Sequence, residues 1–191
     1  DGQIVVGRTD SLEAFRWTEA GGRTILPSTA PPGWMTIATA ISGDGDSIFG
    51  RVEYNGQTQF VRWGSDLQPE ILGIVPGTMP TEIYSETGIV RTSHNGRVVV
   101  GQIRRSDGLF AFGWTRDRGL LPFDQFLSSY GVDVSGWTLF RPTDISADGT
   151  RIVGRGRYQN GPTESLLIII PAPASAALLA PLALLATRRR R

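Results

Sequence analysis

Two neighbouring acidic side chains could bind a metal ion. Asp44 and Asp46 belong to the sequence Gly-Asp-Gly-Asp at Gly43–Asp46, where paired carboxylates and turn carbonyls would suit Ca²⁺. No Glu that could bind in bidentate fashion follows at the spacing of a calcium-binding loop, and the related segments described below carry one acid or none. We therefore favour plain turn chemistry over a metal site at these residues.

His94 is the single histidine, so this chain by itself cannot form a His-pair metal site or the His-Glu-x-x-His zinc motif. It lies just before a turn, where an exposed turn residue is a simpler interpretation than a catalytic base. The sequence contains no Gly-x-Ser-x-Gly nucleophile elbow and no glycine-rich phosphate loop that follows a strand and opens a helix. We predict no catalytic residue, no metal and no cofactor, and expect a protein that is not an enzyme.

One short segment recurs along the chain and must position everything else. Ile145–Gly154 reads ISADGTRIVG, and its relatives stand at Asp1–Gly7, Ile41–Gly50 and Thr92–Gly101, with their first glycines 43 to 53 residues apart. Asp-Gly and Asn-Gly supply the positive φ of a two-residue hairpin turn, and the β-branched run after each turn suits a buried strand. Each copy is therefore predicted to be strand, turn and strand. The repeated glycines are Gly2, Gly7, Gly45, Gly50, Gly96, Gly101, Gly149 and Gly154.

These repeats predict an all-β fold. With the strand before each turn, one unit holds four short antiparallel strands, which is close to the length of one propeller blade. We predict a partial β-propeller over residues 1–170, with about four four-stranded units that start near residues 1, 44, 95 and 148 and with the first and last units incomplete. Because the chain begins inside a repeat, we expect a longer protein whose N-terminal part completes the last blade.

An aromatic pair recurs in the third strand of the first three units. Large aromatic side chains in repeated strands bury much apolar area, so we interpret these pairs as packing between blades. A sugar-stacking platform is the less favoured alternative, because a ligand site would usually use one unit rather than every one. The pairs are Phe15/Trp17, Phe60/Trp63 and Phe112/Trp114.

The longest interruption between strands contains the sequence DQFLSSYG, which predicts a short helix near residues 124–130. Asp124 would cap its N-terminus, and Gly131 would end it in the left-handed conformation. Trp34 and Trp137 each follow a glycine, and each Gly-Trp pair begins eight or nine residues before the Ile of an Ile-Ser pair. We expect both tryptophans to enter the first strand of a unit.

All nineteen basic residues are arginines, and four of them end the chain. Without those four, the remaining charge is about −3, which leaves no electrostatic footprint for nucleic acid, and we expect no nucleic-acid partner. Arg8, Arg51, Arg104 and Arg155 follow the repeated glycines and could form a ring along one face. They could equally be solvated charges that discourage pairing between strand edges. The chain has no cysteine, which excludes disulfides and thiolate metal sites.

The C-terminal residues 171–191 form a separate element. Pro171, Ala172 and Pro173 break any strand, and the following residues 174–187 are uncharged and rich in Ala and Leu. We expect an apolar helix there, but its fourteen residues would span about 21 Å, short of the roughly 30 Å hydrocarbon core of a membrane. The chain ends with the basic residues Arg188, Arg189, Arg190 and Arg191, which favour a cytoplasmic C-terminus with the repeats outside.

This tail resembles the PEP-CTERM sorting signal of Gram-negative and related bacteria. Pro171, Ala172 and Pro173 stand where that family has Pro-Glu-Pro, with Ala172 replacing the acid, and the apolar stretch and the Arg-rich end follow in the same order. The resemblance implies processing by an exosortase-like enzyme and transient or permanent membrane anchoring through residues 174–187.

The repeats resemble the extracellular HAF-type repeats, which are read as propeller-like. The resemblance rests on AFRWT at Ala14–Thr18 and ISADGTRIVG at Ile145–Gly154. Turns of the form Ser-x-Asp-Gly before a strand also occur in TolB-like propellers. Neither this resemblance nor that of the tail supplies a catalytic residue.

Together these features predict an exported protein of the cell surface or extracellular matrix with a non-catalytic binding or structural role. An extracellular polysaccharide or a matrix protein is the expected partner. A glycan-active enzyme built on the propeller is one alternative, and it would need acids clustered at one face. Another is a scaffold that binds a protein through the connectors Pro27–Trp34, Val75–Glu82 and Phe123–Trp137.

Overall fold

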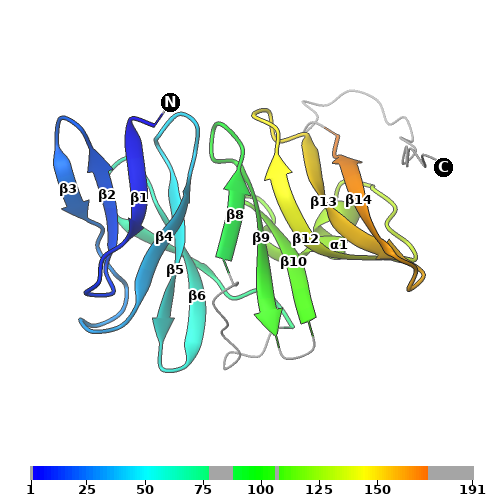
Figure 1. The fold of residues 1–191 in the computed structure, drawn as a ribbon, viewed down its shortest axis with the longest axis horizontal. Coiled ribbons are helices and arrows are strands. Elements are labelled where there is room, and N and C mark those ends of the chain that lie inside the picture. The colour runs from blue at the N-terminus through cyan, green and yellow to red at the C-terminus, as the bar shows by residue number, and fades with distance from the viewer. Residues whose placement is uncertain (1, 78–87, 106–107, 172–191) are drawn as a thin grey trace.

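The computed structural model describes residues 2–77, 88–105 and 108–171, which form four antiparallel sheets and one short helix (Figure 1). We number the sheets 1 to 4 along the chain. Sheet 1 contains β1 (Ile4–Arg8), β2 (Ala14–Thr18) and β3 (Gly22–Ile25). Sheet 2 contains β4 (Thr36–Ile41), β5 (Ile48–Tyr54), β6 (Gln57–Trp63) and β7 (Pro69–Gly73). Sheet 3 contains β8 (Gly88–Thr92), β9 (Val98–Arg105), β10 (Gly108–Thr115) and β11 (Gly119–Pro122). Sheet 4 contains β12 (Trp137–Ile145), β13 (Arg151–Tyr158) and β14 (Thr163–Ile169).

Strands follow one another in chain order within each sheet, and the sheets stand side by side in chain order (Figure 1). The first strands β4, β8 and β12 lie next to one another. Sheet 1 has no described strand before its turn, and no strand follows β14 in the described part of the chain. The prediction of four repeat units, the first and last incomplete, is therefore confirmed. The predicted C-terminal helix and residues 78–82 of the second connector lie outside the described residues.

The repeated turns have one shared hydrogen-bond pattern. In sheet 2 the Ser42 hydroxyl donates to Asp44 Oδ1 (2.5 Å) and accepts from the backbone N–H of Ser47 (2.9 Å). The backbone N–H of Gly45 donates to the Ser42 carbonyl (2.9 Å), with the glycine at φ 79°. Ser93 with Asn95 and Ser146 with Asp148 repeat this pattern in sheets 3 and 4.

The predicted positive φ is confirmed at these turns, but the predicted two-residue length is wrong. Ile41, the last residue of β4, pairs with Ile48, the first residue of β5, and the backbone N–H of Ser42 still donates to the carbonyl of Ser47 between them. Four residues, 43–46, therefore remain in the loop. The Ser42 hydroxyl accepts from the Ser47 N–H and so holds the two ends of this longer loop together. A two-residue turn does occur at Asn55-Gly56, between the paired residues Tyr54 and Gln57.

The second repeated glycine lies opposite a β-bulge. Gly50 pairs with Ala38, and the register then shifts by one residue before Ala40. The same shift occurs opposite Gly101 and Gly154. A Cβ atom on Gly50 would lie 1.9 Å from the carbonyl oxygen of Ile37, so the bulged strand approaches too closely for any side chain.

Neighbouring turns are joined along one edge of the sheets, the upper edge in Figure 1. The backbone N–H of Asp44 donates to the carbonyl of His94 (3.0 Å), and the N–H of His94 donates to the carbonyl of Ala147 (2.9 Å). Each turn glycine also packs on the preceding sheet: a Cβ on Gly45 would lie 2.8 Å from Ile4 Cδ1. The repeated turns therefore connect adjacent sheets as well as reversing the chain.

Three apolar clusters fill the spaces between adjacent sheets, and the aromatic residues of the repeats are central to them. Phe60, Trp63, Phe112 and Trp114 are all 4 % exposed or less, which confirms the packing interpretation for these four residues. Trp63 faces sheet 1, whereas Phe112 and Trp114 face sheet 2. Trp17 differs, because it lies on the outer face of sheet 1 and is 38 % exposed.

Phe60 does not occupy the same place in its sheet as Phe15 and Phe112. Phe15 and Phe112 pair with the repeated glycines Gly7 and Gly101, whereas Val61 pairs with Gly50. Successive side chains of a strand point to opposite faces, so Phe60 points toward sheet 3. Its ring centroid lies 4.6 Å from that of Phe112.

The helix α1 (Phe123–Ser128) packs at the interface of sheets 3 and 4. It begins one residue earlier than predicted, with Pro122 at the N-cap, and the prediction that Asp124 caps it is wrong. Asp124 instead lies in the first turn, where its charge favours the helix macrodipole. Gly131 has φ 75°, which confirms the predicted left-handed residue after the helix.

Candidate functional site

The candidate cation site at Asp44 and Asp46 is built as a turn. Asp44 Oδ1 accepts hydrogen bonds from the Ser42 hydroxyl (2.5 Å) and the Asp46 N–H (3.1 Å). Partial burial raises the pKa of Asp44, while these hydrogen bonds lower it, and the net shift is downward. Within the described ranges no group of three or more His, Cys, Asp or Glu side chains could hold a metal ion.

The equivalent carboxylate in sheet 4 has the same role. The Ser146 hydroxyl (2.5 Å) and the Thr150 N–H (3.0 Å) both donate to Asp148 Oδ1. The hydrogen bond from Ser146 is the largest cause that lowers the pKa of Asp148 to about 2. Both carboxylates are therefore ionised at neutral pH and accept hydrogen bonds inside their own turns.

His94 is exposed, as expected for a turn residue. Its ring lies over the backbone of Gly43, where an added Cβ would be 2.2 Å from His94 Nδ1. Its backbone joins the turns of sheets 2 and 4, as described above. The structure thus places this residue at the contact between turns.

The four arginines after the repeated glycines do not form one set. Arg8, Arg104 and Arg155 are exposed, whereas Arg51 is 6 % exposed and its Nε lies 3.0 Å from Glu53 Oε1. Both expectations are wrong for Arg51, which neither lines an open face nor is a solvated edge charge. It lies between sheets 2 and 3, where a Cβ on Gly88 would be 3.5 Å from its Nη1.

Two Trp–Tyr pairs lie at the ends of the sheets opposite the repeated turns, and three of their four rings are exposed, whereas Trp137 is half-buried. Trp34 and Tyr54 are 41 % and 42 % exposed, and their ring centroids are 5.1 Å apart in an edge-to-face arrangement. Trp137 and Tyr158 also form a pair in sheet 4, with ring centroids 5.3 Å apart and the ring planes tilted by 52°. Trp137 begins the first strand β12, as predicted, whereas Trp34 lies two residues before β4 and is not part of it.

The sequence analysis missed the tyrosines of these pairs. Each tyrosine ends the second strand of its sheet, about twenty residues after the tryptophan, and pairing of the two strands brings the rings together. A Tyr at the end of the second strand in two of the units was the available signal. The corresponding region of sheet 3 lies partly outside the described residues.

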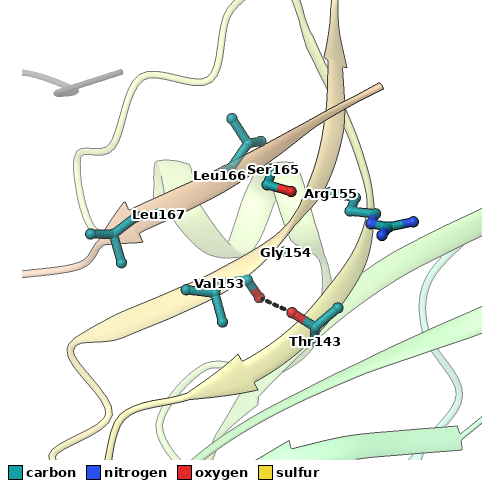
Figure 2. Close-up of a pocket in the computed structure, with 7 residues that line it drawn as sticks. All are labelled: Thr143, Val153, Gly154, Arg155, Ser165, Leu166 and Leu167. Atoms are coloured by element: carbon teal, nitrogen blue, oxygen red, sulfur yellow. Dashed lines mark hydrogen bonds between the residues drawn. The ribbon is translucent and has the colours of Figure 1, made fainter. Parts of the chain in front are cut away.

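An open depression of about 450 Å³ lies on the outer face of sheet 4 (Figure 2). Thr143 contributes from β12, Val153–Arg155 from β13 and Ser165–Leu167 from β14. The Thr143 hydroxyl donates to the carbonyl of Val153 (3.2 Å), which holds β12 against β13 at this place. Val153 and Leu167 are 41 % and 50 % exposed, so the depression has an apolar floor beside the cationic Arg155.

No helix in the described part of the chain is long and apolar enough to cross a membrane. Of the sorting signal predicted from the sequence, the structure describes Pro171 alone. Ala172, Pro173, the apolar stretch 174–187 and Arg188–Arg191 lie outside the described residues.

The fold is similar to that of solved TolB structures. TolB from Acinetobacter baumannii superposes with a TM-score of 0.55 and 18 % identity, over 89 % of this chain and 39 % of that one. A putative TolB from Agrobacterium tumefaciens gives a TM-score of 0.54 and 12 % identity, over 88 % of this chain and 58 % of the other. The chain thus spans less than two thirds of either protein. No protein-family model and no curated protein matches it. At this identity the likeness shows the fold alone, and it confirms the predicted partial β-propeller.

Proposed function

We propose that this chain is an exported repeat protein of the cell surface or extracellular matrix that binds its partner without catalysis. The observation that carries the proposal is the presence of two Trp–Tyr clusters at the surface, Trp34/Tyr54 and Trp137/Tyr158. The Ser, Asp and Asn side chains of the repeats bond within their own turns. In contrast, three rings of the aromatic clusters expose apolar surface to solvent, namely those of Trp34, Tyr54 and Tyr158.

An extracellular polysaccharide is the ligand that suits these clusters. The apolar faces of sugar rings carry C–H groups that pack on aromatic faces, while tyrosine hydroxyl and indole N–H groups can bond to sugar hydroxyls. The Tyr158 hydroxyl already accepts a hydrogen bond from Gln159 Nε2 (3.3 Å) and can still donate its own proton. The two clusters lie on the same edge of sheet 2 and sheet 4. Two separate platforms on one edge suit an extended polymer better than a single sugar.

We expect Trp34→Ala and Trp137→Ala each to weaken polysaccharide binding by about 2- to 10-fold, since one aromatic contact contributes about 0.5–1.5 kcal/mol. Affinity gel electrophoresis with xylan, alginate and a soluble cellulose derivative measures this as loss of retardation. Ile71→Ala is the matched control, because Ile71 is 53 % exposed but stands on β7, away from both clusters.

Unchanged retardation in the variant with both tryptophans replaced would contradict the proposal. Absence of retardation of the native chain by all three polymers would do the same. Release of reducing sugar from any of the polymers would favour the glycan-active alternative instead.

We also propose that the tail sorts the protein through the membrane, with processing by an exosortase-like enzyme. The order of Pro171-Ala172-Pro173, the apolar residues 174–187 and Arg188–Arg191 supports this. In a Gram-negative host with an exosortase, we expect the full chain in the membrane fraction and a chain lacking residues 174–191 in the soluble fraction. Equal partitioning of the two chains would exclude anchoring by the tail.

A further inference from the structure

The chain contains three asparagines, and a glycine follows each of them. The pairs are Asn55-Gly56, Asn95-Gly96 and Asn160-Gly161. Asparagine before glycine rearranges readily, because glycine has no side chain to hinder attack by its backbone nitrogen on the asparagine side chain. The three pairs share this local chemistry, so a difference between their reactivities in the folded protein must come from the structure around them.

The reaction replaces the side-chain amide by an acid in two steps. The glycine nitrogen loses its proton to solvent base and attacks Cγ of the asparagine. A C–N bond forms, the bond from Cγ to Nδ2 breaks, and ammonia leaves with a proton from solvent. Water then adds to either carbonyl carbon of the resulting cyclic imide and opens the ring. The product is aspartate, or isoaspartate in which the main chain passes through Cγ, and one water is consumed for each ammonia released.

The pair Asn95-Gly96 is fixed inside a repeated turn. Asn95 Oδ1 accepts hydrogen bonds from the Ser93 hydroxyl (2.9 Å) and from the backbone N–H of Arg97 (3.1 Å). The N–H of Gly96 donates to the Ser93 carbonyl (3.0 Å), and Gly96 is buried. Attack on Asn95 would have to break these hydrogen bonds, so the folded turn protects it.

The pair Asn160-Gly161 lies in the hairpin turn after β13. The N–H of Gly161 donates to the carbonyl of Tyr158 (2.8 Å). The N–H of Gln159 donates to the carbonyl of Gly136 (2.8 Å), which ties the same turn to the loop before β12. A hydrogen-bonded amide loses its proton only when the local structure opens, so the nitrogen that must attack Asn160 is protected as well.

The pair Asn55-Gly56 differs from the other two. The ladder of β5 and β6 closes at the pair of Tyr54 with Gln57, so the N–H of Gly56 stands outside it. Among the residues that the structure describes, none bonds to this N–H or to the Asn55 side chain. Both residues are exposed, and nothing lies within 4 Å of a Cβ added to Gly56. The attacking nitrogen and the side chain are therefore both accessible.

We propose that Asn55 is a selective deamidation site of the folded protein. It follows Tyr54, whose ring centroid lies 5.1 Å from that of Trp34, at the lower edge of sheet 2 in Figure 1. The product places a carboxylate beside this cluster, and isoaspartate also lengthens the backbone of a two-residue turn. The modification changes one Trp–Tyr cluster and leaves the other intact. Its chemistry is independent of the proposed function, and only its consequence for polysaccharide binding rests on that function.

Incubation of the full chain in neutral buffer, followed by cleavage after arginine and mass spectrometry, tests the proposal. Cleavage places the three asparagines in separate peptides, residues 52–62, 92–97 and 158–188. We expect Asn55 to convert at least about tenfold faster than Asn95 or Asn160, which corresponds to roughly 1.4 kcal/mol in activation free energy. Isoaspartate should form alongside aspartate at position 55, because the imide opens at either carbonyl.

The matched control is the same chain in concentrated urea, where the protecting hydrogen bonds are lost and the three rates should become similar. Asn55→Gln should remove the product at this position, because the longer side chain would have to close a larger ring. Conversion of Asn95 or Asn160 at the rate of Asn55 in the folded chain would overturn the proposal. A preference for Asn55 that persists in urea, or aspartate without isoaspartate at position 55, would do the same. These readouts are peptide masses, so failure of this proposal is distinguishable from failure of polysaccharide binding.

Discussion

Replacement of Gly50 by alanine is expected to destabilise the chain by about 4 kcal/mol or more, enough to unfold much of a domain whose total stability is roughly 5–15 kcal/mol. The added Cβ would lie 1.9 Å from the carbonyl oxygen of Ile37 and 3.0 Å from Cα of Ala38. Both are backbone atoms of the bulged strand β4, and they cannot move aside as the end of a flexible side chain could. Urea unfolding followed by circular dichroism measures the loss.

Gly56→Ala is the matched control for this prediction. Gly56 has φ 71°, so alanine there is strained, but nothing lies within 4 Å of the added Cβ. Its cost should be about 1–2 kcal/mol, which isolates backbone strain from the collision with the bulge. Equal losses for the two variants would show that the approach of β4 is not what requires glycine at position 50.

Trp63→Ala should cost about 3–5 kcal/mol, because it removes a fully buried indole and leaves a cavity between sheets 1 and 2. The indole Nε1–H also donates to the carbonyl of Pro27 (2.8 Å), which ties the loop after β3 to sheet 2. The free energy of unfolding from urea titration measures this loss.

Trp17→Ala is the comparison for Trp63→Ala, because Trp17 stands at the same register position in sheet 1 as Trp63 in sheet 2. Trp17 is 38 % exposed, whereas Trp63 is 0 % exposed. We therefore expect Trp17→Ala to lower the free energy of unfolding by less than about 1 kcal/mol. Equal decreases in the free energy of unfolding for Trp17→Ala and Trp63→Ala would contradict the exposure of Trp17 on the outer face of sheet 1.

Local sequence chemistry predicted the turns of this protein well. Asp-Gly and Asn-Gly predicted a positive φ at the repeated turns, and Gly45, Gly96 and Gly149 have it. The number and order of the sheets followed from the recurrence of these turns. The turn length was wrong because the bridge from the Ser42 hydroxyl to the Ser47 N–H joins residues on both sides of the loop. That bridge depends on the pairing of two strands.

Local chemistry predicted the helix less well. An acidic residue before an apolar run suggested a cap at Asp124, but β11 runs directly into the helix, which begins at Phe123. Phe123 and Phe126 are buried between sheets 3 and 4, so packing determines where the helix starts. The propensity of one N-cap residue is small beside the burial of two phenylalanines.

The candidate site was less predictable than the fold. Trp34 and Trp137 were recognised as repeated positions, but their partners Tyr54 and Tyr158 stand on another strand. Arg51 has the same sequence context as the exposed Arg155, yet it is buried because sheet 3 covers it. Exposure of an otherwise equivalent side chain depends on whether another sheet follows.

The sequence by itself determined the repeat, the turn residues and the alternation of buried and exposed positions, because these depend on neighbours a few residues away. The tertiary structure alone decided why Gly50, Gly101 and Gly154 must be glycine, since the bulge that approaches them belongs to another strand. It also decided that Phe60 faces sheet 3, because a shift of one residue moves a side chain to the other face. The sheets that flank a residue, and not its place in the repeat, make Trp63 part of the core and leave Trp17 on the surface.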